Sequence, residues 1–179
     1  FKEADAVVET TLDFARHTGV TLESRGIVAD WNKAENKMTI YHNGQAPHMM
    51  QHIIAKHLDL NEGLVRIVSR DVGGSFGIKV HVYPDEMAVT AISKKIGRPV
   101  KFIADRLESF TTDIHARCHK ISGKLGVDKN GKILAMEIDD FSGIGPFSMY
   151  PRTSAIETNQ VLNLSGAPYV IPNYKAVGT

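Results

Sequence analysis

The sequence of 179 residues contains a single cysteine, Cys118. One cysteine cannot form a disulfide within the chain, so we expect a reducing compartment and a cytoplasmic location. No uninterrupted apolar run approaches the roughly 18 residues that a membrane-spanning helix needs. The first residues also lack the charged and then apolar order of a secretory signal. These absences predict a chain without a membrane span.

The chain also lacks a surplus of charge of either sign. The sequence has 21 Lys and Arg residues and 20 Asp and Glu residues, which gives a net charge of +1. A general nucleic-acid-binding protein normally gathers a basic surplus on one face, so we expect no nucleic-acid partner. Hydrophobic residues make up 42% and charged residues 23%, which excludes a disordered chain.

Both ends of the sequence run directly into residues that favour strands, at Phe1 and at Thr179. Domain boundaries more often have frayed, polar ends. We therefore expect residues 1–179 to form a single fragment of a longer domain, truncated on the C-terminal side.

The hydrophobic pattern predicts an α+β fold, with a mixed or antiparallel sheet and helices packed on it. Proline at the first helical position predicts helices that begin at Pro47 and Pro84. Asn130-Gly131 between alternating runs predicts a hairpin. A further helix is predicted over residues 154–164. The predicted strands are Asp5–Arg16, Ile27–Trp31, Met38–His42, Leu64–Ser69, Val100–Ala104, Ala116–Val127, Lys132–Phe141 and Asn173–Thr179.

A glycine-rich segment from Asp71 to Lys79 is the strongest candidate for a functional site. Its glycines allow backbone conformations that other residues avoid, and successive N–H groups can then form a concave nest for an anionic oxygen. The segment lacks the Gly-Lys-Ser/Thr ending of nucleotide-triphosphatase phosphate loops, and it does not match G-x-G-x-x-G. A tight turn without a ligand is the alternative interpretation.

Gln45 lies between a predicted strand and the helix that begins at Pro47. Its uncharged amide can donate and accept hydrogen bonds, which suits a neutral or anionic oxygen ligand. The alternative is a residue that only bonds the start of the helix.

The histidines and the cysteine are weaker candidates. His48 and His52 are four residues apart on a predicted helix, but no HExxH pattern or third ligand accompanies them. Strand alternation would place His115 and His119 on the opposite side from Cys118, which has no identifiable acid–base partner. A charged run with Lys101, Asp105, Arg106 and Glu108 is interpreted as a solvated or ion-paired surface.

Five segments in order resemble the molybdenum-cofactor-binding large subunit of the xanthine dehydrogenase, aldehyde oxidase and carbon monoxide dehydrogenase family. Each alone is only moderately specific, whereas the ordered set covers nearly the whole chain. The segments are Thr21–Gly26, Gly44–His48, Asp71–Lys79, Gly97–Phe102 and Asp105–Phe110.

The resemblance implies one half of a two-lobed molybdenum-cofactor-binding domain. The glutamine of the Gln-x-Pro segment, here Gln45, would lie near the oxygen ligands of the metal. Backbone N–H groups of the Gly-Gly-x-Phe-Gly loop would approach an oxo ligand and the pterin, and the phenylalanine ring would border the substrate channel. These roles fall on Gly74, Ser75, Phe76 and Gly77.

The resemblance also implies what lies outside the chain. The family hydroxylates substrates with oxygen from water, and its base is a glutamate near the far C-terminus, so no glutamate of this chain is assigned that role. The implied cofactors are molybdenum with molybdopterin in its cytosine dinucleotide form, with iron–sulfur clusters and FAD on partner subunits.

Two positions depart from the pattern of the family. Ser75 stands where many members have glycine, and Val80 stands where purine-oxidising members have glutamate. Xanthine is therefore a poor candidate, and an aldehyde, carbon monoxide or another N-heterocycle remains. From the residues alone, a stand-alone anion- or nucleotide-binding module that uses the Gly73–Gly77 loop is the alternative function.

Overall fold

The computed structural model describes residues 1–145 and 155–179, and it has the predicted α+β organisation with two sheets. The chain divides into two compact units. Residues Thr18–Ile114 form what we call the central unit. Residues Phe1–His17 and His115–Thr179 together form the terminal unit.

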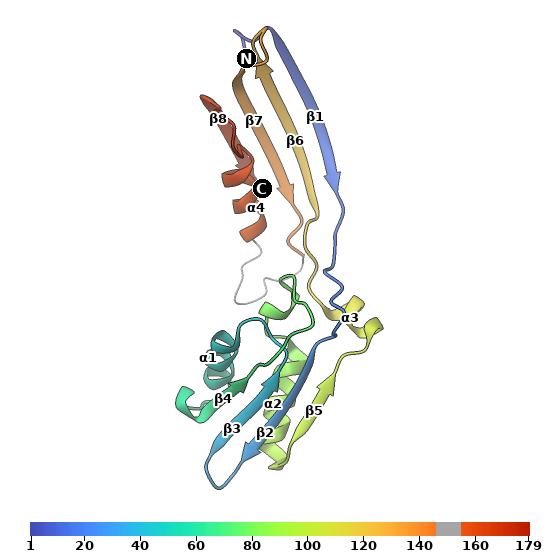
Figure 1. Cartoon of the computed structure of the whole chain (residues 1–179), viewed down its shortest axis with the longest axis vertical. Helices are drawn as coiled ribbons and strands as arrows, with labels where there is room; N and C mark the ends of the chain where they lie inside the picture. The colour runs from blue at the N-terminus through green and yellow to red at the C-terminus, as the bar shows by residue number, and fades with distance from the viewer. Residues whose placement is uncertain (146–154) are drawn as a thin grey trace. The chain divides into compact units, whose positions relative to one another are not determined.

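The central unit contains a four-stranded sheet in the order β4-β3-β2-β5 (Figure 1). Strands β2 and β3 form the predicted antiparallel hairpin, and β5 pairs antiparallel with β2. Strand β4 pairs parallel with β3, and the helix α1 (Pro47–His57) makes the crossover that parallel pairing requires. The strands are β2 (Gly26–Asn32), β3 (Lys37–His42), β4 (Val65–Val68) and β5 (Val100–Ile103).

Two helices and the sheet bury the core of the central unit. Helix α1 packs beside β4, and α2 (Pro84–Ile96) packs on β2 and β5 (Figure 1). The alternation in β2 turns Ile27, Ala29 and Trp31 inward, and α1 buries Met50, Ile53 and Ile54 as its periodicity predicts. The core cluster of buried residues comprises Ile27, Ala29, Trp31, Met38, Ile40, Met50, Ile54, Ala55, Val65 and Val89.

The start of α2 confirms the helix predicted at Pro84. Pro84 occupies the first turn, and Gly97 ends the helix with a φ of 66° in the left-handed region. Two short 3-10 helices, η1 (Glu62–Leu64) and η2 (Ile78–Val80), complete the unit together with α3 (Arg106–Thr112).

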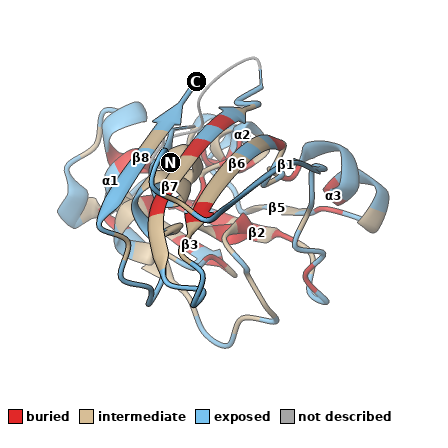
Figure 2. Cartoon of the chain, turned by 90° about the horizontal axis from the view of Figure 1, so that it is seen from above, coloured by how far each residue is buried: buried red, intermediate tan, exposed pale blue. Residues whose placement is uncertain are grey.

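The terminal unit contains a second sheet in the order β1-β6-β7-β8. Strands β6 and β7 form the hairpin predicted at Asn130-Gly131, where Gly131 has a φ of 81°. Helix α4 (Ile156–Leu164) packs on β7 and β8. Strand β1 is exposed along its whole length (Figure 2). The strands are β1 (Ala6–Phe14), β6 (His119–Val127), β7 (Ile133–Ser142) and β8 (Asn173–Gly178).

A buried polar cluster joins the hairpin and α4 within the terminal unit. The Nδ1 atom of His119 lies 2.9 Å from Oδ1 of Asp140, which is fully buried. The hydroxyl of Ser142 donates to Oδ2 of Asp140, and Thr158 on α4 donates to the Ser142 hydroxyl at 2.7 Å. These contacts satisfy a carboxylate that would otherwise be costly to bury.

Three sequence predictions need correction or restriction. The predicted strand Ala116–Val127 begins only at His119, because Arg117 and Cys118 have φ values of 71° and 78° and break the alternation assumed for His115 and His119. The charged run lies at the surface as predicted, but its residues Asp105 and Glu108 also start α3, which the prediction did not include. The start of the helix predicted over residues 154–164 lies outside the described residues at position 154.

None of the helices in residues 1–145 and 155–179 combines the length and apolar character needed to cross a membrane.

Candidate functional site

The segment Gly73–Lys79, called the glycine loop from here on, has an unusual backbone. Gly74, Phe76 and Gly77 have φ values of 96°, 53° and 90°. Glycine adopts such values readily, but a phenylalanine in this region costs on the order of 1–2 kcal/mol. Strain of this kind persists only where the surroundings impose it, and it is concentrated at functional sites. The backbone of the loop is therefore held in a strained conformation, unlike the backbone of an ordinary relaxed turn.

As far as the described residues show, the N–H groups in the middle of the loop are available to a ligand. The flanking donors are satisfied: Gly73 N–H donates to Glu23 at 2.8 Å, and Ile78 N–H donates to the Ser75 carbonyl at 2.9 Å. Within the described part of the chain, no acceptor takes a hydrogen bond from the backbone N–H groups of residues 74–77. Successive N–H groups in a segment with several left-handed residues can form the kind of nest that binds anionic oxygens. This donor set fits the oxygen ligands of an anionic cofactor.

Gln45 lies directly against the glycine loop. The Ser75 hydroxyl donates a short hydrogen bond to Oε1 of Gln45, and the Gln45 N–H donates to the Lys79 carbonyl at 2.9 Å. Helix α1 has Ala46 as its N-cap and no side-chain capping bond, so Gln45 does not serve the helix start. The structure thus brings together all five residues that the sequence singles out: Gln45, Gly74, Ser75, Phe76 and Gly77.

Side-chain packing explains two of the glycines. A Cβ atom at Gly73 would lie 2.5 Å from Cβ of Glu23, and one at Gly74 would lie 3.1 Å from Cε2 of Phe76. The Phe76 side chain itself is 77% exposed and contributes little to the core. An exposed aromatic ring on a strained residue is better suited to contact a ligand than to stabilise the fold.

The charge of Lys79 is neutralised inside the protein. Its side chain is 1% exposed, and its ammonium lies 2.8 Å from Oε2 of Glu23, which is 41% exposed. Burial acts to raise the pKa of Glu23, but hydrogen bonds from the Lys79 ammonium and the Gly73 N–H outweigh it, so this pKa is lowered. The loop therefore presents neutral N–H donors, with its one lysine already paired.

Glu23→Gln is expected to destabilise the protein most near neutral pH. The folded-state pKa of Glu23 lies below the unfolded value, so its stabilisation is present above the unfolded pKa of about 4.3 and is lost as pH falls through the folded pKa. Urea denaturation of both proteins at pH 7, 5 and 3 should show a difference that shrinks towards pH 3. Glu35→Gln, in the exposed β2–β3 turn, is the matched control. A difference that is constant from pH 7 to pH 3 would contradict the assignment.

A buried charge network in the central unit was missed by the sequence analysis. Arg25 is 1% exposed, and its guanidinium binds both carboxylate oxygens of Asp85 at 2.8 Å and Oδ1 of Asp113 at 2.6 Å. It also stacks 3.7 Å from the ring centroid of Tyr83. Burial acts to lower the pKa of Arg25, but the bonds to both carboxylates raise it overall, and burial raises the pKa of Tyr83. The partners lie about 60 and 90 residues away in the sequence, so no local pattern reveals them.

The weaker candidates do not assemble into a site. His52 on α1 pairs with Glu62, while His48 is exposed. In residues 1–145 and 155–179, no three side chains of His, Cys, Asp or Glu gather in a way that could hold a metal ion. The exposed charges of the run Lys101–Glu108 include Asp105 and Glu108, which cap α3.

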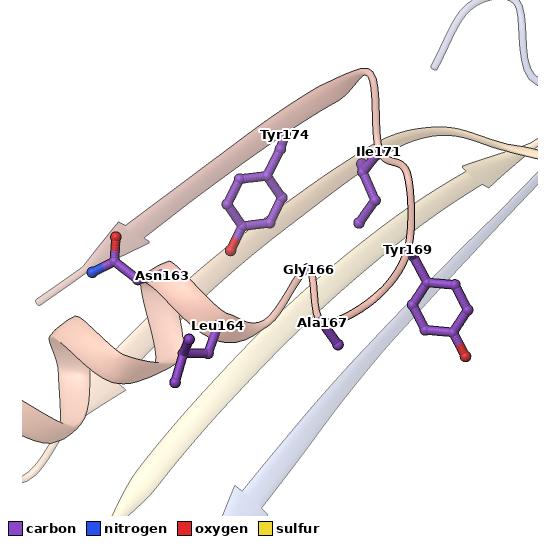
Figure 3. A pocket seen from close by; sticks show the side chains of 7 residues that line it. All are labelled: Asn163, Leu164, Gly166, Ala167, Tyr169, Ile171 and Tyr174. Atoms are coloured by element: carbon purple, nitrogen blue, oxygen red, sulfur yellow. The ribbon is translucent and has the colours of Figure 1, made fainter.

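A cavity of about 260 Å³ lies in the terminal unit, at the end of α4 and beside β8 (Figure 3). It is lined by residues such as Leu164, Tyr169, Ile171 and Tyr174. The Tyr174 hydroxyl donates to the Leu162 carbonyl at 2.7 Å. No charged side chain lines it, and none of the predicted site residues belongs to it. It offers no acid–base pair for catalysis.

Comparison with known proteins identifies the class of this domain. The family model described as "Molybdopterin cofactor-binding domain" matches residues 1–179. The chain therefore belongs to the molybdopterin cofactor-binding domain family of molybdenum hydroxylases, which confirms the resemblance seen in the sequence.

Individual relatives extend this finding. The chain is 34% identical, over 82% of its length, to the carbon monoxide dehydrogenase large chain of Hydrogenophaga pseudoflava. It is 32% identical, over 98% of its length, to the 6-hydroxypseudooxynicotine dehydrogenase complex subunit gamma of Paenarthrobacter nicotinovorans. These matches span 18% and 22% of the two relatives, so the chain corresponds to about a fifth of their length.

Solved structures agree with the fold. The quinoline 2-oxidoreductase from Pseudomonas putida 86 superposes on the whole chain with a TM-score of 0.94 at 28% identity, and this match covers 23% of that protein. The reconstituted CO dehydrogenase from Oligotropha carboxidovorans also covers the whole chain, with a TM-score of 0.85 at 26% identity and 23% of its own length.

Proposed function

We propose that this chain supplies part of the molybdenum-cofactor site of a hydroxylase, an oxidoreductase that adds oxygen from water to its substrate. The substrate would be an aldehyde, carbon monoxide or an N-heterocycle. The relatives named for carbon monoxide and for nitrogen-containing ring compounds support this range. Val80 after the glycine loop, where the resemblance puts glutamate in purine-oxidising members, argues against a purine.

One observation carries the proposal: a strained loop whose N–H groups at residues 74–77 bond no acceptor among the described residues, hydrogen-bonded through Ser75 to the exposed side chain of Gln45. Neutral, fixed donors of this kind stabilise negative oxygens without transferring a proton to them. The strained, left-handed Phe76 supports a loop shaped for a ligand.

Each residue of the site would have a distinct task. The N–H groups of residues 74–77 would bind anionic oxygens of the cofactor. Because Oε1 of Gln45 accepts from Ser75, the NH₂ group of Gln45 would be left to donate to the same ligand. The exposed ring of Phe76 would border the substrate and exclude water from one side. When bound, molybdenum with molybdopterin supplies the redox chemistry.

The remaining parts of the enzyme would lie outside residues 1–179. They include the glutamate base, the rest of the large subunit and partner subunits that carry iron–sulfur clusters and flavin. We propose the cytosine dinucleotide form of molybdopterin and a cytoplasmic location. On this account the isolated chain has no turnover and binds no stoichiometric molybdenum, which metal analysis can check. The matches to molybdopterin-binding chains do not favour a stand-alone nucleotide-binding module.

Gln45→Ala and Phe76→Ala are expected to separate activity from stability. Both side chains are exposed, so each change should alter the free energy of unfolding by less than about 0.5 kcal/mol. In the assembled enzyme, Gln45→Ala should lower turnover about 10- to 100-fold, since it removes a group that orients the cofactor ligands. Phe76→Ala should raise KM more than it lowers kcat, because its ring borders the substrate.

Steady-state kinetics and urea denaturation measure the two effects. Tyr41→Ala is the control, because Tyr41 is a half-exposed aromatic residue on β3 of the same unit. Turnover that is unchanged in Gln45→Ala and Phe76→Ala would show that this face serves only the assembly of subunits.

A further inference from the structure

The Glu86 side chain connects the two segments of the candidate site. It is 1% exposed and lies in the first turn of α2. Its Oε1 atom lies 3.0 Å from Nε2 of His42, and its Oε2 atom accepts from the Tyr83 N–H at 3.1 Å. The two oxygens of one buried carboxylate therefore hold two different segments of the chain.

The first connection leads to Gln45. The His42 ring lies so close to the next segment that a Cβ atom at Gly44 would be 2.2 Å from its Cε1 and Nδ1 atoms. Among the described residues, Nδ1 of the buried His42 has no hydrogen-bond partner. The bond to Glu86 is thus the polar contact that sets the orientation of the ring, and the ring supports the backbone that leads into Gln45.

The second connection leads to the glycine loop. The Tyr83 hydroxyl donates to the Ile78 carbonyl at 2.9 Å, and the Ile78 N–H donates to the Ser75 carbonyl at 2.9 Å. Tyr83 is itself fixed by the Arg25 guanidinium stacked on its ring. The exit of the loop, and with it the left-handed Phe76–Gly77 pair, is held through Tyr83.

Charge keeps this carboxylate in place. The Arg25 guanidinium approaches Oε1 of Glu86 at 3.5 Å while its stronger bonds go to Asp85 and Asp113. The Asp85 carboxylate shares the guanidinium but makes no hydrogen bond to His42 or Tyr83. Glu86 and Asp85 are therefore neighbours with the same charged partner, and Glu86 alone of the two reaches both segments of the site.

We propose that Glu86 is a positioning residue that sets Gln45 and the glycine loop relative to each other. This role rests on the proposed function of the two segments as one cofactor site. Mutation of a residue that supports the groups around a metal, without itself touching the metal, commonly lowers metal affinity or activity about 10- to 100-fold.

The test uses NMR of the 179-residue chain, which does not depend on a bound cofactor. Glu86→Gln preserves the size of the side chain but removes its charge and replaces one acceptor oxygen with an NH₂ donor, so at least one of the two connections is altered. We expect the backbone amide signals of residues 74–77 or the side-chain NH₂ signals of Gln45 to shift, while signals of the β6–β7 hairpin stay in place. Asp85→Asn is the control: it weakens one bond to Arg25, whose guanidinium keeps Asp113 and its place over the Tyr83 ring, so both sets of signals should shift much less than in Glu86→Gln.

Two milder variants keep the test decisive if Glu86→Gln does not fold. Tyr83→Phe removes the hydroxyl that holds Ile78 and should shift signals of the glycine loop more than those of the Gln45 side chain. His42→Gln should do the reverse. Equal shifts in both sets for both variants, or no shift in either set, would overturn the proposal.

The assembled enzyme separates this inference from the proposed function. Glu86→Gln should lower kcat about 10- to 100-fold and Asp85→Asn much less. If Gln45→Ala impairs turnover but Glu86→Gln does not, the site stands and the positioning role fails. If the NMR shifts occur but neither variant changes turnover, the connection exists and the cofactor site fails.

Discussion

Replacing Arg25 with methionine is expected to lower the free energy of unfolding by about 3–5 kcal/mol, because it leaves buried carboxylates without their cation. The side chains of Glu86 and Asp113 are only 2% and 5% exposed, so water cannot replace the guanidinium. Methionine preserves much of the apolar stem, which limits the effect to the lost charge and hydrogen bonds. Urea denaturation followed by circular dichroism measures the change.

Arg66→Met provides the comparison for this prediction. Arg66 is exposed on β4 of the same unit, and its replacement should change stability by no more than about 0.5 kcal/mol. An Arg25→Met protein within about 1 kcal/mol of the wild type would show that the buried network is not needed for the fold.

Gly74→Val is expected to abolish most molybdenum binding in the assembled enzyme. Gly74 has a φ of 96°, which a β-branched residue adopts only with strain, and an added Cβ would lie 3.1 Å from the Phe76 ring. The backbone of the loop must then move, and the N–H groups of residues 74–77 would change position. We expect molybdenum content, measured by elemental analysis, to fall about 10- to 100-fold.

Gly131→Val separates this effect from strain alone. Gly131 has a φ of 81° in the β6–β7 turn, and an added Cβ would meet no atom within 4 Å. This variant should carry a similar loss of stability, on the order of 1–2 kcal/mol, but keep its molybdenum. Equal molybdenum contents in the two variants would contradict the role assigned to the glycine loop.

The regular elements could be predicted because their signals are local. Alternation defined β2 and β3, proline marked the first turns of α1 and α2, and Asn130-Gly131 marked a hairpin. Helix α3 also had a local signal, since Asp105 and Glu108 cap each other across its first turn, but the charges were interpreted only as surface. The start of β6 could not be predicted, because Arg117 and Cys118 adopt positive φ without being glycine.

The candidate site was predictable only in part. The glycines and Gln45 could be named from their types and from the family resemblance, and the structure brings them together through Ser75. The supporting residues could not be named, because Arg25, His42 and Glu86 meet across 44 to 61 residues of sequence. A buried charge is defined by its partners, and these appear only when the chain is folded.

The measurement that tests the central claim most directly is the position of molybdenum in a crystal of the assembled enzyme, located by its anomalous X-ray scattering. The account predicts a peak beside the glycine loop, with cofactor oxygens about 2.7–3.2 Å from N–H groups of residues 74–77 and from the Gln45 amide. A peak remote from the loop, with those N–H groups bonded to protein acceptors, would contradict it.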